Sequence, residues 1–144
     1  MTTVNIYLNF LGNCEEAFNF YKSIFGGEFS YIGRFKDIPQ QEGMPELPVE
    51  MKNQILHIAL PISQETMLMG SDTGGEWAPG FKQGNNFSIS VTTDTKEEAD
   101  RLFNALSVKG DIIMPIDFAF WGDYYGHFTD QFGINWMIMF TPEG

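Results

Sequence analysis

The stretch VNIYLNFLGN at residues 4–13, followed by CEEA at residues 14–17, decides the fold because the chain repeats it. Residues 86–99, NFSISVTTD followed by TKEEA, show the same order of an alternating segment and an acidic helix start. Alternation of apolar and polar residues predicts a half-buried strand, and a cap residue before acidic residues predicts a helix. A repeat of this length in a chain of 144 residues predicts two halves of one domain.

The same pattern analysis gives each half the order β-α-β-β-β. Helices are expected at residues 14–25, capped by Asn13, and from residue 95 to 108, capped by Asp94 or Thr95. Strands are expected at residues 4–10, 28–35, 54–61 and 66–70 in the first half, and at 86–92, 111–115, 124–129 and 135–140 in the second. Residues 36–53 contain three prolines and are expected to form a long loop.

The predicted fold class is therefore α+β, with two tandem β-α-β-β-β modules related by a pseudo-twofold axis. The modules span about residues 1–72 and 84–144 of a single domain, with a linker at residues 73–83. Together they are expected to form a cup-shaped mixed sheet with both helices on the outside. Trp77 lies in the linker, where it is expected to serve as a lid or to anchor a dimer contact.

Composition and charge exclude several classes of partner. A hydrophobic content of 43% with 15% aromatic residues is typical of a folded domain, and no apolar run is long enough to span a bilayer. The net charge of −11 disfavours nucleic acids and anionic membranes as partners. The first residues lack the features of a signal peptide, and the single cysteine, Cys14, has no internal disulfide partner, so a cytoplasmic location is expected.

Polar side chains occupy one face of the repeated strand. Leu8 and its neighbours on the same face are apolar and are expected to pack on the helix. The other face carries Asn5, Tyr7 and Asn9 in the first copy, and Asn86, Ser88 and Ser90 in the second. These side chains either line a shared ligand-binding cup or face solvent, and the high aromatic content favours the cup.

Longer motifs show a family resemblance. The segments YLNFLGNCEEAFNFY at 7–21, LMGSD at 68–72, FWGD at 120–123 and TDQFGINW at 129–136 resemble the PhnB-like branch of the vicinal oxygen chelate superfamily. That superfamily includes glyoxalase I, extradiol dioxygenases and bleomycin resistance proteins. Members of the branch often carry a demethylubiquinone methyltransferase label, but the sequence shows no glycine-rich loop of the kind that a Rossmann-like cofactor site uses.

The resemblance also implies where a metal would bind, and the chain departs from the family there. The positions that match the ligand positions of metal-dependent members are Asn5, Met67 or Met69, Asn86 and Met137. Amide and thioether groups are poor ligands for Zn, Ni or Fe, although a thioether suits soft ions such as Cu(I). We therefore expect no family metal site and no cofactor.

Two histidines are candidates for chemistry. His57 lies in an apolar strand and is expected to turn toward the cup, and the branch tends to place a His here, followed by a Ser-Asp pair like Ser71-Asp72. His57 with Asp72 could act as a base or anchor an anionic ligand; alternatively, His57 is structural and bonds to the backbone or a partner chain. His127 is expected at the rim of the cup or in solvent, without a catalytic role.

An aromatic segment at residues 118–125 has two interpretations. In a pocket, Trp121 and Tyr125 would stack on a planar ligand while Asp123 bonds a polar group; otherwise the segment packs a dimer contact or the base of a hairpin. Cys14 begins a helix, so the helix dipole is expected to lower its pKa somewhat, and a packed thiol is the expected role.

Two function classes follow from these residues. The first is a small-molecule binding protein, a homodimer with a polar-aromatic cup and no metal. The second is a lyase or isomerase that uses His57 with Asp72 or Asp123 as its acidic partner. A purely structural dimer fits the polar strand faces less well.

Overall fold

The chain folds into two compact units, Met1–Phe81 and Lys82–Gly144. The structure is a computed structural model, and it describes residues 2–39, 42–43, 46–73 and 80–143. Trp77, which the sequence suggests as a lid or dimer anchor, lies outside these residues. The expected cup concerns both units together and stays a prediction, so each unit is described by itself.

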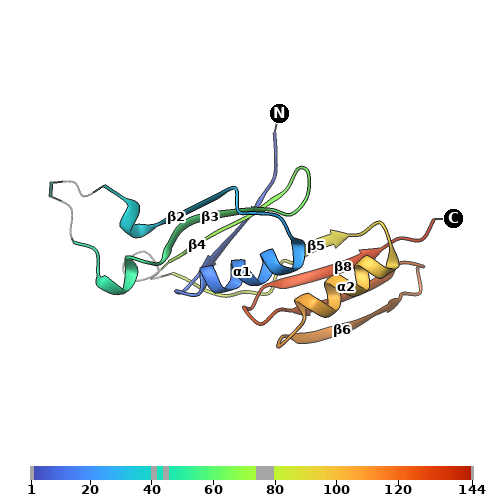
Figure 1. The fold of residues 1–144 in the computed structure, drawn as a ribbon. Coiled ribbons are helices and arrows are strands. Elements are labelled where there is room, and N and C mark those ends of the chain that lie inside the picture. The colour runs from blue at the N-terminus through green and yellow to red at the C-terminus, as the bar shows by residue number, and fades with distance from the viewer. Residues whose placement is uncertain (1, 40–41, 44–45, 74–79, 144) are drawn as a thin grey trace. The chain divides into compact units, whose positions relative to one another are not determined.

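The first unit is a four-stranded sheet with one α-helix against it (Figure 1). Its elements are β1 (Ile6–Phe10), α1 (Cys14–Phe25), β2 (Tyr31–Arg34), the 3-10 turns η1 (Phe35–Asp37) and η2 (Val49–Met51), β3 (Ile55–Pro61) and β4 (Met67–Asp72). The strand order is β1-β4-β3-β2, with β1 parallel to β4 and the other neighbours antiparallel.

The second unit repeats this topology. Its elements are β5 (Ile89–Thr92), α2 (Lys96–Leu106), β6 (Asp111–Phe118), β7 (Tyr124–Thr129) and β8 (Asn135–Phe140). The strand order is β5-β8-β7-β6, with β5 parallel to β8 and the other pairs antiparallel. The predicted α+β class with two tandem β-α-β-β-β modules is therefore confirmed.

The core of each unit lies between its helix and one face of its sheet. In the first unit, Phe18 of α1 is fully buried and meets Phe10 edge-on, with ring centroids 6.2 Å apart. Gly70 of β4 allows this approach, because a Cβ there would lie 2.7 Å from the Phe18 ring and 2.9 Å from the Leu8 carbonyl oxygen. In the second unit, Phe103 of α2 packs edge-on against Phe128, with ring centroids 5.0 Å apart.

Several elements begin or end a few residues away from their approximate predicted bounds. The strand expected at residues 28–35 is shorter and covers Tyr31–Arg34, and the one expected at 66–70 continues to Asp72 because it pairs with all of β1. The strand expected at 86–92 begins only at Ile89, so Asn86 and Ser88 precede it, and Phe87 is exposed. The strand expected at 111–115 runs on to Phe118 along β7, and the helix expected to reach residue 108 ends at Leu106.

The helix starts differ from each other. Of the two predicted caps for α2, Asp94 and Thr95, the structure has Thr95, whose side chain accepts the Glu98 N–H at 3.1 Å. Asn13 makes no such side-chain bond at the start of α1. The carboxylate of Asp72 takes that role from the neighbouring strand, accepting the Cys14 N–H at 2.9 Å. Asp72 is 58 residues away from Cys14 in the sequence, so the residues next to α1 give no indication of this cap.

Candidate functional site

The face of the first sheet that turns away from α1 carries polar and aromatic side chains. Leu8 and Phe10 of β1 are buried toward α1, so the alternate residues Tyr7 and Asn9 lie on the opposite face. Register places Met69 beside Tyr7 and Ser71 beside Asn9. We call this surface the His57 face, and its members are Tyr7, Asn9, Tyr31, His57, Met69 and Ser71.

His57 lies between two tyrosine rings. Its ring centroid is 5.6 Å from that of Tyr7, at an interplanar angle of 29°, and 5.6 Å from that of Tyr31, at 46°. The Tyr7 hydroxyl lies 3.4 Å from His57 Nδ1, a long hydrogen bond whose direction depends on the tautomer. Both tyrosines remain accessible, Tyr7 being 45% and Tyr31 54% exposed.

Tyr31 is a member of this surface that the sequence analysis missed. Gly33 pairs with His57 across the sheet, and a Cβ on Gly33 would lie 2.6 Å from the Tyr31 hydroxyl oxygen. The tyrosine side chain therefore folds over the glycine, which leaves space for it. The signal was the alternation of Tyr31 and Gly33 on one face of β2, which places the ring on the same face as His57.

The predicted asparagines bond to strand β4. Asn5 precedes β1, and its side-chain oxygen accepts the Met67 N–H at 2.8 Å. Asn9 Oδ1 accepts a weak hydrogen bond from the Ser71 hydroxyl at 3.5 Å. Asn5 thus joins the start of β1 to β4, whereas Asn9 and Ser71 remain as adjacent polar groups on the His57 face.

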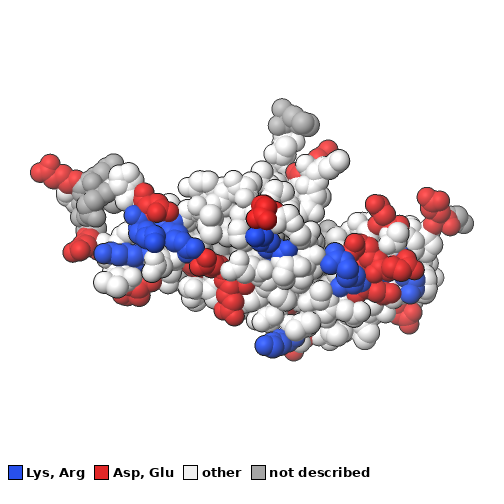
Figure 2. All heavy atoms as spheres, viewed as in Figure 1, with Lys and Arg blue, Asp and Glu red and all other residues white. Residues whose placement is uncertain are grey.

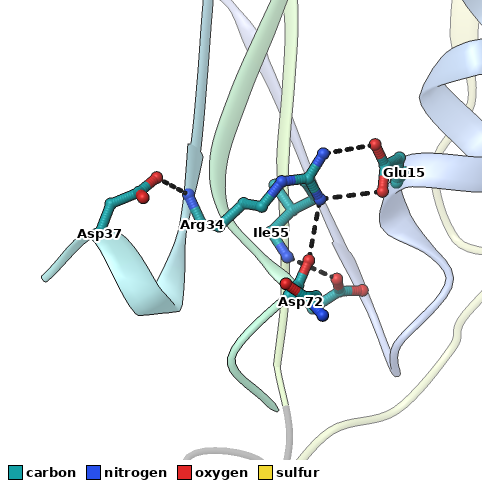
Figure 3. Close-up of polar contacts among 6 residues, drawn as sticks. Glu15, Arg34, Asp37, Ile55 and Asp72 are labelled. Carbon is teal, nitrogen blue, oxygen red and sulfur yellow. Dashed lines mark hydrogen bonds and ion pairs between the residues drawn. The ribbon is translucent and has the colours of Figure 1, made fainter. Parts of the chain in front are cut away.

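Asp72 is buried, with 4% of its surface exposed, and its carboxylate bonds to three main-chain amides. Oδ1 accepts the N–H groups of Gly12 at 3.0 Å and Cys14 at 2.9 Å, while Oδ2 accepts the Ile55 N–H at 2.9 Å. The close-up in Figure 3 shows the bond to Ile55. One carboxylate therefore joins the β1–α1 turn to the start of β3.

The structure does not bring His57 and Asp72 together. A side chain at position 70 would project toward Phe18 of α1. Because residues two apart in a strand project to the same face, the Asp72 side chain is also on the helix side of β4. His57 contacts Tyr7 and Tyr31 on the opposite side. The carboxylate that the sequence suggests as the partner of His57 is thus bonded to backbone across the sheet.

In the second unit, the predicted aromatic site is a hairpin tip between β6 and β7. Trp121 Nε1 donates to Asp123 Oδ2 at 2.9 Å, and the Trp121 ring lies 6.1 Å from Tyr125. Phe120 is 98% exposed and meets Trp121 edge-on. The predicted residues Trp121, Asp123 and Tyr125 are therefore neighbours. Asn86 and Ser88 lie in the exposed segment before β5.

The comparison with family models decides the classification of the chain. Residues 2–139 match the model described as 3-demethylubiquinone-9 3-methyltransferase. The chain belongs to this family, which is the PhnB-like branch that its sequence motifs resemble. The methyltransferase activity in this description is the name of the family, and it is not assigned to this PhnB-like chain.

Similar proteins support the family and the fold. Protein YjdN of Escherichia coli K12 is 31% identical over 137 residues, covering 92% of this chain and 90% of its own. The crystal structure of PA1353 from Pseudomonas aeruginosa is 35% identical with a TM-score of 0.81, covering 99% of this chain and 100% of its own. The PhnB protein from Bacillus cereus is 26% identical with a TM-score of 0.73, covering 97% and 100%.

The wider superfamily is supported at the level of fold. A glyoxalase/bleomycin resistance/dioxygenase family enzyme from Burkholderia phytofirmans is 15% identical with a TM-score of 0.59, covering 97% of each chain. At this level of identity the likeness shows a shared fold, and this is the fold that the resemblance to the vicinal oxygen chelate superfamily implies.

Charged groups of the PhnB-like chain lie mainly outside the His57 face. Arg34 forms a bidentate ion pair with Glu15 of α1, with N–O distances of 2.9 and 2.6 Å (Figure 3). On the face shown in Figure 2, Lys and Arg groups lie beside Asp and Glu groups, consistent with the ion pairs Lys22–Glu28 and Lys96–Asp100. Hydrogen bonding to Arg34, aided by its charge, lowers the pKa of Glu15.

The thiol of Cys14 is not an activated one. Its side chain is fully buried, and burial together with the charges of Asp72 and Glu15 raises its pKa well above the usual range. The expectation of a pKa lowered by the helix dipole was therefore wrong, because desolvation and the capping carboxylate outweigh the dipole.

No three His, Cys, Asp or Glu side chains come together to hold a metal ion within the described residues. The family metal positions carry amides and thioethers, of which Asn5 is bonded to the Met67 amide. Neither helix in the described ranges has the length and apolar character needed to cross a membrane.

Proposed function

We propose that the protein binds a small, planar and uncharged organic molecule on the His57 face. The observation that carries this proposal is the cluster of three rings in which Tyr7 stacks on His57 and Tyr31 lies tilted beside it, with both tyrosine rings accessible. Aromatic rings bind planar ligands by stacking, and the imidazole and hydroxyl groups provide polar contacts that orient them. Asn9 and Ser71 supply further hydrogen-bonding groups beside the rings.

The surrounding charges favour an uncharged ligand over an anion. Strands β1 to β4, which the structure describes in full, contain one Lys or Arg residue, Arg34, and its guanidinium forms an ion pair with Glu15. The amides of Gly12 and Cys14 at the start of α1, where an anion would otherwise bind, already donate to Asp72. The net charge of −11 further repels anions.

The second unit supplies a further set of proposed ligand-binding groups. Trp121 and Tyr125 offer accessible rings, and Asp123 holds the indole N–H. Asn86 and Ser88 lie in the exposed segment before β5 and stay proposed contacts.

A binding role fits the described geometry better than a lyase or isomerase role. The lyase or isomerase alternative pairs His57 with Asp72 or Asp123 as its acid. Asp72 is bonded to three backbone amides, and Asp123, in the second unit, accepts the Trp121 indole N–H.

We also propose a homodimer in the cytoplasm. Exposed apolar side chains at Phe118 and Phe120 suit contact with a second copy, and light scattering would measure the mass of the particle in solution.

The proposal is tested by binding of acridone, a neutral, planar and fluorescent probe. Tyr31→Ala removes one ring of this cluster and is expected to raise the Kd by about 2–10-fold, the equivalent of about 0.5–1.5 kcal/mol. Ile32→Ala is the matched control, because Ile32 is the next residue in β2, is 42% exposed and alternates to the other face. Equal affinity of both variants and the wild type would contradict the proposal.

A further inference from the structure

The face of the second sheet turned away from α2 carries one histidine. Tyr124, Gly126 and Phe128 of β7 are buried toward α2, where Phe128 meets Phe103. His127, which alternates with them, therefore lies on the opposite face and is half-buried. Its ring is 5.8 Å from that of Tyr125, and no hydrogen bond to a ring nitrogen of His127 is present among the described residues.

A methionine flanks His127 on each side of its strand. The register pairs His127 with Met114 of β6 and with Met137 of β8. His127 and Met137 are directly opposed in a regular antiparallel ladder, where such residues project from the same face with Cβ atoms about 4.5–5.5 Å apart. The register between β6 and β7 shifts on both sides of Met114, so Met114 lies at a bulge opposite His127. Trp136 and Ile138, the neighbours of Met137, are fully buried toward α2, which places the Met137 thioether on the side of His127.

Two thioethers and one imidazole on adjacent strands form a ligand set for a soft cation. Thioether sulfur favours Cu(I), whereas Mg²⁺, Ca²⁺ and Mn²⁺ favour oxygen ligands. The flexible methionine side chain has three rotatable bonds, so both sulfur atoms can turn toward an ion held by the imidazole. Met114 is 45% exposed and gives the ion access, and the net charge of −11 attracts cations.

We infer that Met114, His127 and Met137 form a binding site for Cu(I) or its redox-stable analogue Ag(I). This inference does not rest on the proposed function, because none of the three residues is among the proposed ligand-binding groups, of which Tyr125 lies beside His127. The site also differs from the metal positions implied by the family resemblance, since only Met137 is common to both.

The test is a titration of the full chain with Ag(I) alone, with the methionine methyl groups followed by NMR. The methyl signals of Met114 and Met137 and the ring signals of His127 are expected to shift together and to saturate at one equivalent. Met114→Leu, Met137→Leu and His127→Gln are each expected to raise the Kd by at least about tenfold, since even a lost outer-shell partner costs about 10–100-fold. Leucine conserves volume, so the methionine variants test the ligand and not the packing.

Controls separate this site from other soft ligands of the chain. Met67→Leu removes an exposed thioether on β4, which pairs with Pro61 and not with a histidine, and it is expected to leave the Kd unchanged. Cys14→Ala removes the thiol and is also expected to bind Ag(I). Loss of binding in Cys14→Ala, an equal effect of Met67→Leu and Met114→Leu, or Zn(II) binding as tight as Ag(I) would overturn the inference.

Discussion

The carboxylate of Asp72, the last residue of β4, accepts the N–H of Cys14, the first residue of α1, at 2.9 Å. The same side chain also holds Gly12 and Ile55, so three segments meet at one buried group. The second unit has a comparable group after β7. There Asp130 accepts the N–H groups of Phe132 and Ile134 and the indole N–H of Trp136.

Replacement of Asp72 is expected to reduce the stability of the protein. Asp72→Asn keeps the size of the side chain but replaces one acceptor oxygen by a donor, which leaves at least one of the three amides without its bond. The free energy of unfolding is expected to fall by about 1–3 kcal/mol, the cost of a buried unsatisfied donor. Urea denaturation followed by circular dichroism measures the change.

Asp37→Asn is the matched control for that measurement. Asp37 also accepts a backbone N–H, that of Arg34 at 2.8 Å, but the bond is exposed to solvent (Figure 3). We expect a loss of less than about 0.5 kcal/mol, as for surface substitutions in general. Equal losses for the two variants would show that the burial of Asp72 has no special role.

Cys14 is expected to react slowly with thiol reagents in the folded protein. Burial and the nearby carboxylates of Asp72 and Glu15 raise its pKa, so little of the reactive thiolate is present and the reagent lacks access. Labelling with 5,5′-dithiobis(2-nitrobenzoate) at pH 8 is expected to be at least about 100-fold slower than in urea-unfolded chain, given an opening free energy of several kcal/mol. Comparable rates would contradict the burial of this thiol.

The fold was largely predictable, because the repeated pattern reports local structure. The bounds of α1, β7 and β8 match the predicted ranges, since the glycines after α1, the turn between β7 and β8 and the alternation of side chains lie within or beside those segments. The start of β5 did not match, because its first residue is set by pairing with Trp136 of β8 and not by the alternation that extends back to Asn86. Long-range pairing of this kind is not encoded in a local pattern.

The ion pair between Glu15 and Arg34 is expected to make stability depend on acid pH. Arg34 lowers the pKa of Glu15 in the folded state, through a hydrogen bond first and its charge second. The contribution is therefore present above the unfolded pKa of about 4.3 and is lost as the pH falls through the lower folded value. Glu15 is partly exposed and screened by solvent, so the contribution is expected to be less than about 1 kcal/mol.

Glu15→Gln is the variant that measures this contribution. The wild type is expected to be more stable than the variant at pH 6, and the difference is expected to shrink as the pH is lowered toward 3. Denaturant titrations at fixed ionic strength give both values. A difference that stays constant across this range would show that the charge of Glu15 does not contribute.

The candidate site was predictable only in part. Alternation identified Tyr7 and His57 on one face, because it depends on the strand alone. The sequence pattern could not show that Asp72 bonds to the backbone of residues 12, 14 and 55, since these contacts form only when three distant segments meet. Tyr31 was not predicted as part of this face, because its ring reaches His57 only by folding over Gly33, which has no side chain to block it.

Two glycine substitutions are expected to separate the His57 face from the core. Gly33→Ala would place a Cβ 2.6 Å from the Tyr31 hydroxyl, the end of a movable side chain, so the ring turns aside at little cost. Stability is expected to fall by less than about 1 kcal/mol, whereas the His57 ring protons shift in NMR spectra because Tyr31 moves. Gly70→Ala meets the buried Phe18 ring and the Leu8 backbone, which cannot move aside, and is expected to cost about 1–3 kcal/mol. In Gly70→Ala the NMR signals of the His57 ring protons are expected to stay unchanged, because the Tyr31–His57 contact lies on the opposite face of the sheet. A shift of these protons in Gly70→Ala but not in Gly33→Ala would show that Gly33, and not Gly70, is the glycine remote from His57.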